Sequence, residues 1–266
     1  PNNSMIILDL NSGAQPLWQS LSNYFGHGWS WDMLHNYGGR RGLYGMLDVI
    51  ASQPVLARAS EGNTMVATGM TPEAIEQNPI MYQLMAEMGW RSEAPDVDEW
   101  VAAYAARRYG YKPGTAPSAA MAWALLRTGA YNRSQDVSII EEEPSINTYT
   151  SRNTNATATT EAWRGLIAAA TKGEVSAEVG PFLYDLTDVG RQVLSNTFGD
   201  LQGILCAHVT LWTEGPPPEG LEASVKSLTQ QMVKLLSDFD AVLATNENYL
   251  LGTWLSDAES WAFGDE

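Results

Sequence analysis

The stretch Thr64-Met-Val-Ala-Thr-Gly-Met-Thr-Pro-Glu-Ala-Ile-Glu-Gln-Asn-Pro79 shows how the first part of the chain folds. Its start is short and apolar, which predicts a buried strand that ends near residue 68. Asn78 followed by Pro79 is typical of a helix start, because asparagine suits the N-cap and proline suits the first helical position. A helix is therefore expected over 79–89, and Glu73 lies in the loop between strand and helix.

Two more units with the same order of elements precede this one. Short apolar runs at 5–10 and 29–34 predict strands, and helices are expected at 15–20 and 41–51. Strand, loop and helix in repetition are typical of a parallel α/β fold. Three units are too few for a closed eight-stranded barrel, which takes about 250 residues. They can form the last part of one.

Helical spacing replaces the strand pattern from Pro95 onward. One apolar stripe on a long helix is predicted by Val225, Leu228, Met232, Leu235, Phe239 and Val242. A second stripe is predicted by Trp163, Leu166, Ile167 and Ala170. Further helices are expected at 97–109, 116–130, 181–198 and 246–261. The chain is therefore divided into an α/β part, residues 1–94, and an all-α domain, residues 95–266.

The charge of the chain limits its partners. Thirty-one acidic against fifteen basic residues give a net charge of −16. This charge repels a phosphate backbone, so nucleic acid is not expected as a partner. Simple solubility explains the charge, and so does an acidic compartment, where protonated carboxylates repel one another less. No apolar run reaches about 18 residues, so no membrane span is expected.

The cysteine and asparagine patterns bear on the compartment. The single cysteine, Cys206, rules out an internal disulfide and a multi-cysteine metal site, and its apolar neighbours predict a small core residue. Three Asn-x-Ser/Thr triplets begin at Asn2, Asn132 and Asn155. Such triplets accept N-linked glycans, so together they favour a secretory pathway.

Glu73 is the first candidate for catalysis. In a barrel of parallel units, the loops that follow the strands form the face on which active sites are built. A carboxylate there acts as nucleophile or as general acid/base, depending on its distance from a second carboxylate. Glu76 is a rival in the same loop, and the alternative for either residue is an ordinary solvated glutamate.

Polar and aromatic residues also follow the second predicted strand. Trp31, His35 and Asn36 stand there, ahead of two glycines that allow backbone to approach a ligand. Aromatic faces and hydrogen-bonding side chains suit a sugar. The alternative is that Trp31 belongs to the core and His35 is a hydrogen-bonded structural residue. Asp9, at the end of the first strand, is a weaker candidate of the same type.

Other chemistries find little support. The sequence contains no Gly-x-Ser-x-Gly elbow, His-Glu-x-x-His, Walker loop or EF-hand spacing. The three histidines, His27, His35 and His208, are too widely separated to predict a metal site. No metal or other cofactor is expected.

Five longer motifs surround the candidate residues. They are Trp31-Asp-Met-Leu-His-Asn-Tyr-Gly-Gly39, Gly42-Leu-Tyr-Gly45, Thr68-Gly-Met-Thr-Pro-Glu-Ala-Ile75, Tyr82-Gln-Leu-Met-Ala-Glu-Met-Gly-Trp90 and Ala105-Ala-Arg-Arg-Tyr-Gly110. In this order the sequence resembles the α-N-acetylglucosaminidases of glycoside hydrolase family 89. The resemblance is dense over residues 5–110 and patchier, but collinear, nearly to the end.

The resemblance implies a fold and an activity. In the family a (β/α)8 barrel precedes an all-helical domain that closes one side of the active site. This chain is then expected to hold the last three β/α units of a (β/α)8 TIM barrel followed by an all-α domain, truncated at its C-terminus. The implied reaction removes terminal, non-reducing α-linked N-acetylglucosamine from glycans with retention of configuration, without a metal. In animal relatives the substrate is heparan sulfate in the lysosome, so a lysosomal or secreted protein is expected.

The resemblance also implies roles for single residues. Glu73 matches the nucleophile of the family, and Trp31, His35 and Asn36 match residues that shape the pocket. The acid/base glutamate of the family lies on an earlier strand, outside this chain. The expected partners are therefore a glycan with terminal α-linked N-acetylglucosamine and the remaining portion of the same enzyme, and the isolated chain is expected to be inactive. The alternative is a noncatalytic sugar-binding or interaction protein derived from this fold.

Overall fold

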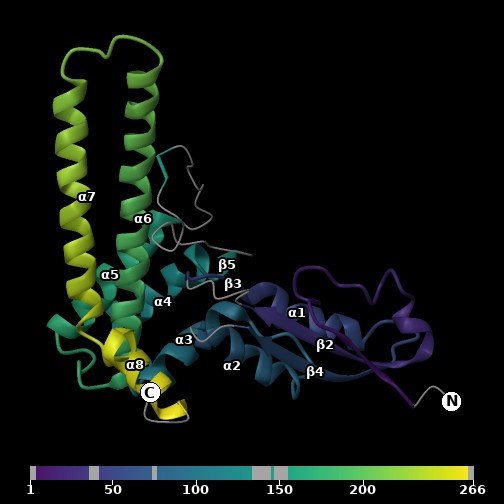
Figure 1. Ribbon diagram of the computed structural model, residues 1–266. Helices are drawn as coiled ribbons and strands as arrows, with labels where there is room; N and C mark the ends of the chain where they lie inside the picture. The colour runs from purple at the N-terminus through teal and green to yellow at the C-terminus, as the bar shows by residue number, and fades with distance from the viewer. Residues whose placement is uncertain (1–3, 36–41, 74–76, 134–144, 147–154, 263–266) are drawn as a thin grey trace.

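The structure, a computed structural model, describes residues 4–35, 42–73, 77–133, 145–146 and 155–262. A parallel three-stranded sheet lies in the first part of the chain (Figure 1). Its strands are β1 (Ile6–Asp9), β2 (Gly28–His35) and β4 (Met65–Pro72), in the order β1-β2-β4. The prediction of three parallel strands from the sequence is confirmed.

Two helices cover one face of this sheet and form the core with it. They are α1 (Leu47–Arg58) and α2 (Pro79–Met88), which contact each other and β4. Alternate residues of β2, Trp29, Trp31 and Met33, point to this side and are buried, as the two-residue period of a strand requires. Buried partners from the helices are Leu47, Ile50, Ile80, Leu84 and Met88.

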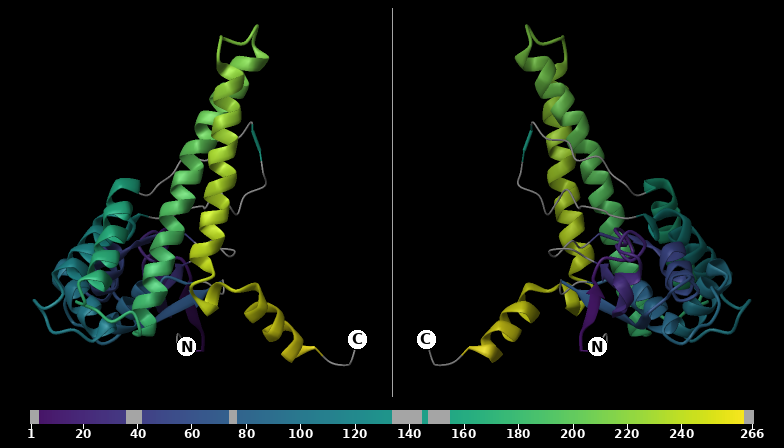
Figure 2. Two further views of the ribbon diagram at one scale, coloured as in Figure 1. Left: turned by 90° about the vertical axis from the view of Figure 1, so that its left-hand side faces the viewer. Right: turned by 90° about the vertical axis from the view of Figure 1, so that its right-hand side faces the viewer.

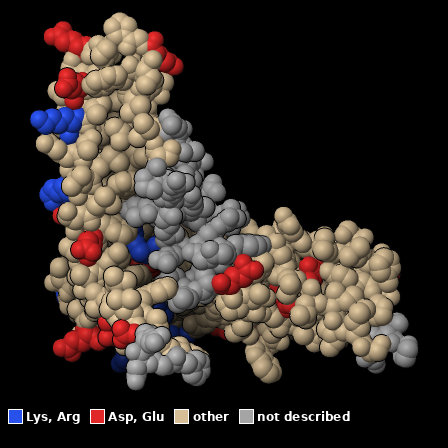
Figure 3. All heavy atoms as spheres, in the orientation of Figure 1, with Lys and Arg blue, Asp and Glu red and all other residues tan. Residues whose placement is uncertain are grey.

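The other face of the sheet is exposed along its two outer strands. Ile6 and Leu8 of β1 are 61% and 59% exposed, and Val66 of β4 is 62% exposed. Neither β1 nor β4 has a second strand partner within the described part of the chain. Figure 3 shows several acidic groups, and mostly uncharged atoms, on the side of the α/β part that faces the viewer. Exposed apolar side chains beside two unpaired edges are the arrangement that further strands would complete.

The helix expected at 15–20 does not form. This segment consists of irregular backbone and turns. The 3-10 helix η1 (Asn23–Gly26) follows it, and Tyr24 and Phe25 in η1 have positive φ angles of 55° and 53°. The carboxylate of Asp9 accepts hydrogen bonds from the backbone N–H groups of Leu17 and Trp18, at 3.0 and 3.3 Å. Because Asp9 captures these amides, the turn wraps around the strand end instead of continuing as a helix.

Two further boundaries differ from those predicted. The second helix begins at Leu47 and not at 41, because Gly45 and Met46 form the short strand β3. A Cβ atom at Gly45 would lie 2.3 Å from Met81 Sδ, so the backbone approaches α2 closely at this point. The third strand continues to Pro72, past the predicted end at 68, because β2 pairs with it as far as His35.

The second part of the chain is helical, as predicted. Its elements are α3 (Val97–Tyr109), α4 (Pro117–Gly129), α5 (Ala156–Thr171), α6 (Gly180–Thr213), α7 (Leu221–Leu243), the 3-10 helix η4 (Glu247–Tyr249) and α8 (Leu251–Trp261). α6 and α7 lie side by side and project beyond the rest of the molecule (Figures 1 and 2). In both views of Figure 2, α8 leads away from them toward the C-terminus.

The predicted stripes have different outcomes. On α7, Leu228 and Met232 are buried, and the other four stripe residues are half-buried, so this stripe is confirmed. On α5, Leu166 is buried as predicted and Trp163 and Ala170 are half-buried, but Ile167 is exposed, so its place in the stripe is wrong. The buried stripe runs instead through Ala162, Leu166 and Ala169, on the side that contacts α4. Cys206 is only half-buried, so its assignment to the core is wrong. Within the described residues, no helix combines the length and apolarity that crossing a membrane requires.

The two parts of the chain are joined by hydrogen bonds and by ion pairs. β3 (Gly45–Met46) pairs antiparallel with β5 (Asn132–Arg133), and Leu47 N–H donates to Tyr131 O at 3.2 Å. Arg127 of α4 forms an ion pair with Asp48 of α1 at 2.6 Å. The helical part is thus fixed against the C-terminal side of the strands.

Candidate active site

Glu73 follows the last residue of β4 directly. Pro72 is the register partner of His35, so Glu73 stands at the point where both neighbouring strands end. Gly69 pairs with Asp32, and a Cβ atom at Gly69 would lie 2.3 Å from Asp32 Oδ1, which places both residues on one face of the sheet. Side chains alternate along a strand, and this alternation, continued one residue past the end of β4, puts Glu73 on the same face. It is the face opposite to α1 and α2, and Glu73 is exposed.

His35 ends β2 on the other face and is buried. Its ring lies 4.5 Å from the ring of Tyr44 and 5.8 Å from that of Tyr82, measured between centroids. Burial lowers the pKa of His35 to about 4, because a charged imidazolium loses its hydration there. The ring is therefore neutral over the physiological range of pH.

Asn78 stands before the first residue of α2, as predicted, but its side chain does not cap the helix. Its amide group contacts His35 Nε2 at 3.1 Å and the carbonyl oxygen of Gly42 at 3.2 Å. The hydroxyl of Tyr82, on α2, donates to Gln77 Oε1 at 2.5 Å and lies 3.5 Å from the carbonyl oxygen of His35. Residues at the start of α2 therefore hold the end of β2.

Trp31 occupies a different position from the one a stacking residue needs. Its side chain is 0% exposed and packs among core residues on the helix-covered side of the sheet. A ring in this position packs in the core beneath the end of β2, between the sheet and the helices, and presents no face to a ligand. Asn36, predicted from the same motif, and the rival Glu76 lie outside the described residues.

Asp32 is a candidate that the sequence reasoning missed. It is 4% exposed and lies on the same face as Gly69 and Glu73. Burial raises the pKa of its carboxyl and the nearby Asp9 charge adds to this effect, whereas a hydrogen bond from the Ser30 hydroxyl opposes it. A buried carboxyl with a raised pKa near a strand end is a common feature of active sites. The sequence feature that could have indicated Asp32 as a site residue is its position inside the Trp31–Gly39 motif.

Asp9 has a structural role. It is buried, and the two backbone amides that it accepts from hold the turn after β1. These contacts occupy one carboxylate oxygen, Oδ2. Asp9 thus stabilises the loop that follows its own strand.

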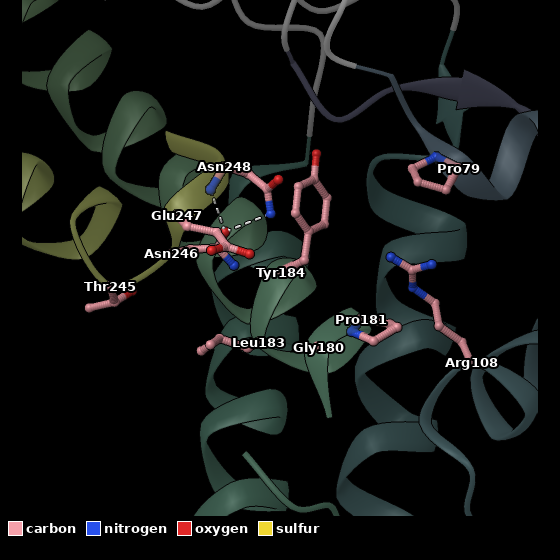
Figure 4. A pocket seen from close by; sticks show the side chains of 10 residues that line it. All are labelled: Pro79, Arg108, Gly180, Pro181, Leu183, Tyr184, Thr245, Asn246, Glu247 and Asn248. Carbon is pink, nitrogen blue, oxygen red and sulfur yellow. Dashed lines mark hydrogen bonds between the residues drawn. The ribbon is translucent and has the colours of Figure 1, made fainter. Parts of the chain in front are cut away.

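The helical part adds a cavity of about 600 Å³ near the start of α2 (Figure 4). Pro79 and Arg108 lie on one side of it, and Tyr184 and Asn248 on the other. The Arg108 guanidinium makes two hydrogen bonds to Asp185, at 2.6 and 2.8 Å, so its charge is already paired. The remaining lining residues are Gly180, Pro181, Leu183, Thr245, Asn246 and Glu247. The cavity is therefore bordered by residues of both parts of the chain.

The sequence matches two models of one protein family. The alpha-N-acetylglucosaminidase (NAGLU) tim-barrel domain matches residues 1–92, and the alpha-N-acetylglucosaminidase (NAGLU) C-terminal domain matches residues 100–266. The chain belongs to the alpha-N-acetylglucosaminidase family. A member of this family, alpha-N-acetylglucosaminidase of Homo sapiens, is 36% identical over 276 residues, which cover 100% of this chain and 35% of the relative. The chain thus spans about a third of the length of the curated relative.

Solved structures agree with the family assignment. A family 89 glycoside hydrolase from Clostridium perfringens, in complex with 2-acetamido-1,2-dideoxynojirmycin, superposes with a TM-score of 0.82 at 25% identity. The match covers 98% of this chain and 29% of that one. A variant of the Clostridium perfringens enzyme with two glutamates replaced by glutamine, in complex with its substrate GlcNAc-alpha-1,4-galactose, gives a TM-score of 0.84 at 25% identity and covers 100% of this chain and 30% of that one. The alpha-N-acetylglucosaminidase fold is therefore shown over the whole chain.

Proposed function

We propose that this chain supplies the nucleophile of a retaining α-N-acetylglucosaminidase, and that Glu73 is this nucleophile. The observation that carries the proposal is the position of Glu73, which directly follows β4 and is exposed. Strand alternation, continued by one residue, supports a position on the sheet face away from α1 and α2. Family membership supports the substrate class, a glycan with terminal α-linked N-acetylglucosamine. Heparan sulfate, the substrate that the resemblance implies for animal relatives, is one such glycan.

The reaction follows from a pair of carboxyl groups. A carboxylate oxygen of Glu73 attacks the anomeric carbon, the bond to the leaving oxygen breaks, and that oxygen takes a proton from the second carboxyl group. Water then attacks the same carbon after losing a proton to that group, and Glu73 leaves as a carboxylate. In retaining enzymes the two carboxyl groups stand about 5–5.5 Å apart. The second glutamate belongs to the remaining portion of the enzyme, and the step requires no metal.

Three further residues near the end of β2 have supporting roles in this proposal. His35 and Asn36, at the end of β2, shape the sugar pocket, and Trp31 supports them from the core. The helical part lines a cavity near the start of α2, with Arg108 and Tyr184 at its border.

The nucleophile is tested by chemical rescue in the full-length enzyme. Glu73→Ala should release 4-nitrophenol from its α-N-acetylglucosaminide about a thousandfold or more slowly, because the covalent intermediate cannot form. Azide should restore turnover and yield the β-configured glycosyl azide, because azide attacks from the side that the carboxylate has vacated. The matched control is Glu61→Ala, an exposed glutamate ahead of the other end of β4. An unchanged rate in Glu73→Ala, or rescue without the β-azide, would contradict the assignment.

The remaining portion of the enzyme is proposed as the partner of the open sheet. The uncovered Ile6, Leu8 and Val66 and the unpaired edges of β1 and β4 support this. Size-exclusion chromatography with urea unfolding tests it on the isolated 266-residue chain. We expect aggregation or a non-cooperative transition, and a cooperatively folded monomer would argue for the noncatalytic alternative.

A lysosomal or secreted location is proposed from the acceptor asparagines. Asn132, on β5, and Asn155, ahead of α5, are exposed, whereas Asn2 lies outside the described residues. Asn155 caps α5 through its Oδ1, which accepts from Ala158 N–H at 3.1 Å, and a glycan on its nitrogen leaves this bond in place. A mass decrease of the natively expressed enzyme on treatment with an N-glycan amidase is expected.

A further inference from the structure

Asn78 stands at the N-cap of α2, but its side chain makes no hydrogen bond to the backbone of the helix. An asparagine at the N-cap stabilises a helix by about 1 kcal/mol through a bond to a free backbone amide. Asn78 is 4% exposed and makes no such bond. Its amide instead lies between Gly42, His35 and Tyr131. Its side chain therefore makes three contacts to residues distant in sequence in place of one local hydrogen bond, which indicates a role outside the capping of α2.

The orientation of the Asn78 amide is determined from two sides. The carbonyl oxygen of Gly42 can only accept, so the amide atom 3.2 Å away is the nitrogen, Nδ2. On the opposite side, the hydroxyl of Tyr131 lies 3.4 Å from the other amide atom, Oδ1. Burial raises the pKa of Tyr131 well above its usual value, so the hydroxyl keeps its proton and donates it. Both neighbours therefore select the same orientation.

This orientation determines the hydrogen on His35. Nδ2 of Asn78 is a donor, so His35 Nε2, at 3.1 Å, must accept and carries no hydrogen. The ring is neutral at physiological pH because burial lowers its pKa to about 4. A neutral imidazole carries one hydrogen, which is then on Nδ1.

The peptide group between Gly42 and Leu43 keeps this arrangement in place. Its carbonyl oxygen accepts from Asn78, and its N–H group donates to Oε1 of Gln192 on α6 at 2.8 Å. Leu43 and Gln192 are 2% and 1% exposed, so neither bond is exchanged for water. The amide of Asn78 cannot turn over without leaving this carbonyl group facing another oxygen.

We propose that Asn78 is a positioning residue that holds His35 in the Nδ1–H tautomer, with Tyr131 of the helical part as its anchor. The ring then has Nδ1–H as its hydrogen-bond donor, and its one acceptor nitrogen is already engaged. A ring in this state can donate from Nδ1 to an acceptor oxygen, such as a sugar hydroxyl or an acetamido carbonyl group, and has no free acceptor nitrogen for a group that can only donate. The proposal rests on the proposed function for the role of His35 beside the sugar, and the state of the ring can be measured without any turnover.

The tautomer is measured by nuclear magnetic resonance on the full-length enzyme labelled with ¹⁵N-histidine. Two-bond ¹H–¹⁵N correlations distinguish the two tautomers, and the signals of His35 are identified by their loss in His35→Gln. We expect a protonated Nδ1 and an unprotonated Nε2 at pH 7. A protonated Nε2 in the unaltered enzyme would overturn the proposal, and this measurement needs no Asn78 variant to fold.

Asn78→Asp tests the cause, because it replaces the donor nitrogen by an acceptor oxygen of the same shape. We expect the His35 hydrogen to move to Nε2, or the ring to take up a second proton, and kcat to fall by about tenfold to a hundredfold. The matched control is Asn63→Asp, which also loses a side-chain donor to a backbone oxygen, that of Arg58, but precedes β4 at the end remote from Glu73. Its His35 signals and kcat should stay as in the unaltered enzyme.

The outcomes separate this inference from the proposed function. An unchanged tautomer in a folded Asn78→Asp enzyme contradicts the role of Asn78, whatever the result for Glu73. A moved hydrogen with unchanged kcat contradicts the importance of the tautomer for the sugar site. Failure of azide rescue in Glu73→Ala contradicts the nucleophile assignment and leaves the tautomer result standing.

Discussion

Gln192, on α6, accepts a hydrogen bond from the backbone N–H of Leu43 at 2.8 Å, across 149 residues of sequence. Its amide nitrogen donates to Oδ1 of Asn196 at 3.0 Å, which determines which end of the amide faces Leu43. Both partners are buried, so water cannot replace either bond. The helical part therefore satisfies a backbone group of the strand part in the protein interior.

Replacing Gln192 by leucine should destabilise the enzyme. The N–H of Leu43 would stay buried without a partner, at a cost of about 1–3 kcal/mol. Urea unfolding of the full-length enzyme, followed by tryptophan fluorescence, measures the effect. Gln230→Leu, on the exposed side of α7, is the control for the same chemical change. Equal midpoints for the two variants would show that the bond to Leu43 contributes nothing.

Gly190→Ala should be destabilising, although alanine is by about 1 kcal/mol the better helix former. A Cβ atom at Gly190 would lie 2.8 Å from the ring of Trp163, inside contact distance. The ring cannot retreat without losing its hydrogen bond to the carbonyl oxygen of Leu186. We expect a loss of about 1–3 kcal/mol. The control is Gly252→Ala in α8, where a Cβ atom meets nothing within 4 Å, so the melting temperature should rise slightly. A similar rise for Gly190→Ala would contradict the close contact with Trp163.

Asp185→Asn should have a large effect on stability. Asp185 binds the Arg108 guanidinium twice and accepts from the Tyr109 hydroxyl at 2.8 Å. Its neutral replacement leaves a buried arginine without a counter-charge, which costs about 3–5 kcal/mol. The exposed pair of Lys234 and Asp238, at 2.7 Å, provides the control, because Asp238→Asn should cost about 0–1 kcal/mol. Thermal unfolding of both variants at equal ionic strength compares them.

His35 should make the enzyme less stable as the pH falls. Its pKa is about 4 in the folded protein and 6.5 in the unfolded chain, so between these values only the unfolded state takes up a proton. The stabilisation is complete above pH 6.5 and is lost as the pH falls toward 4, by about 3 kcal/mol in total. His35→Gln should therefore lose less stability between pH 7 and pH 4 than the unaltered enzyme does. Urea midpoints at several pH values test this, with His208→Gln on α6 as the comparison. Equal changes of the midpoint with pH in His35→Gln and in the unaltered protein would contradict the prediction.

The regular elements could be predicted from the sequence because local patterns determine them. The helix over 97–109 has the predicted bounds, since Asp96 caps it and Gly110 ends it with a positive φ of 74°. The parallel strands followed from three short apolar runs. The turn after β1 could not be predicted, because it depends on Asp9 accepting from amides eight and nine residues away.

The candidate site could be predicted less well. The position of Glu73 followed from the start of α2, but the extra length of β4 depends on its pairing with β2. The burial of Trp31 depends on which face of the sheet is covered, and a motif of polar and aromatic residues does not reveal this. Asn78 looked like a simple helix cap, because its true partners, His35 and Tyr131, are distant in sequence. The catalytic role of Glu73 and the roles of His35 and Asn36 stay predictions.

Two short strands, β3 and β5, have a consequence for how such enzymes change over evolution. Each has two residues, and they come from opposite sides of the boundary between the α/β and helical parts. A cut between the parts would separate this ribbon and leave the buried amides of Leu43 and Gln192 facing water or nothing. We therefore expect that the helical part, grafted onto a foreign barrel, folds as it does here only when the graft includes both sides of the ribbon.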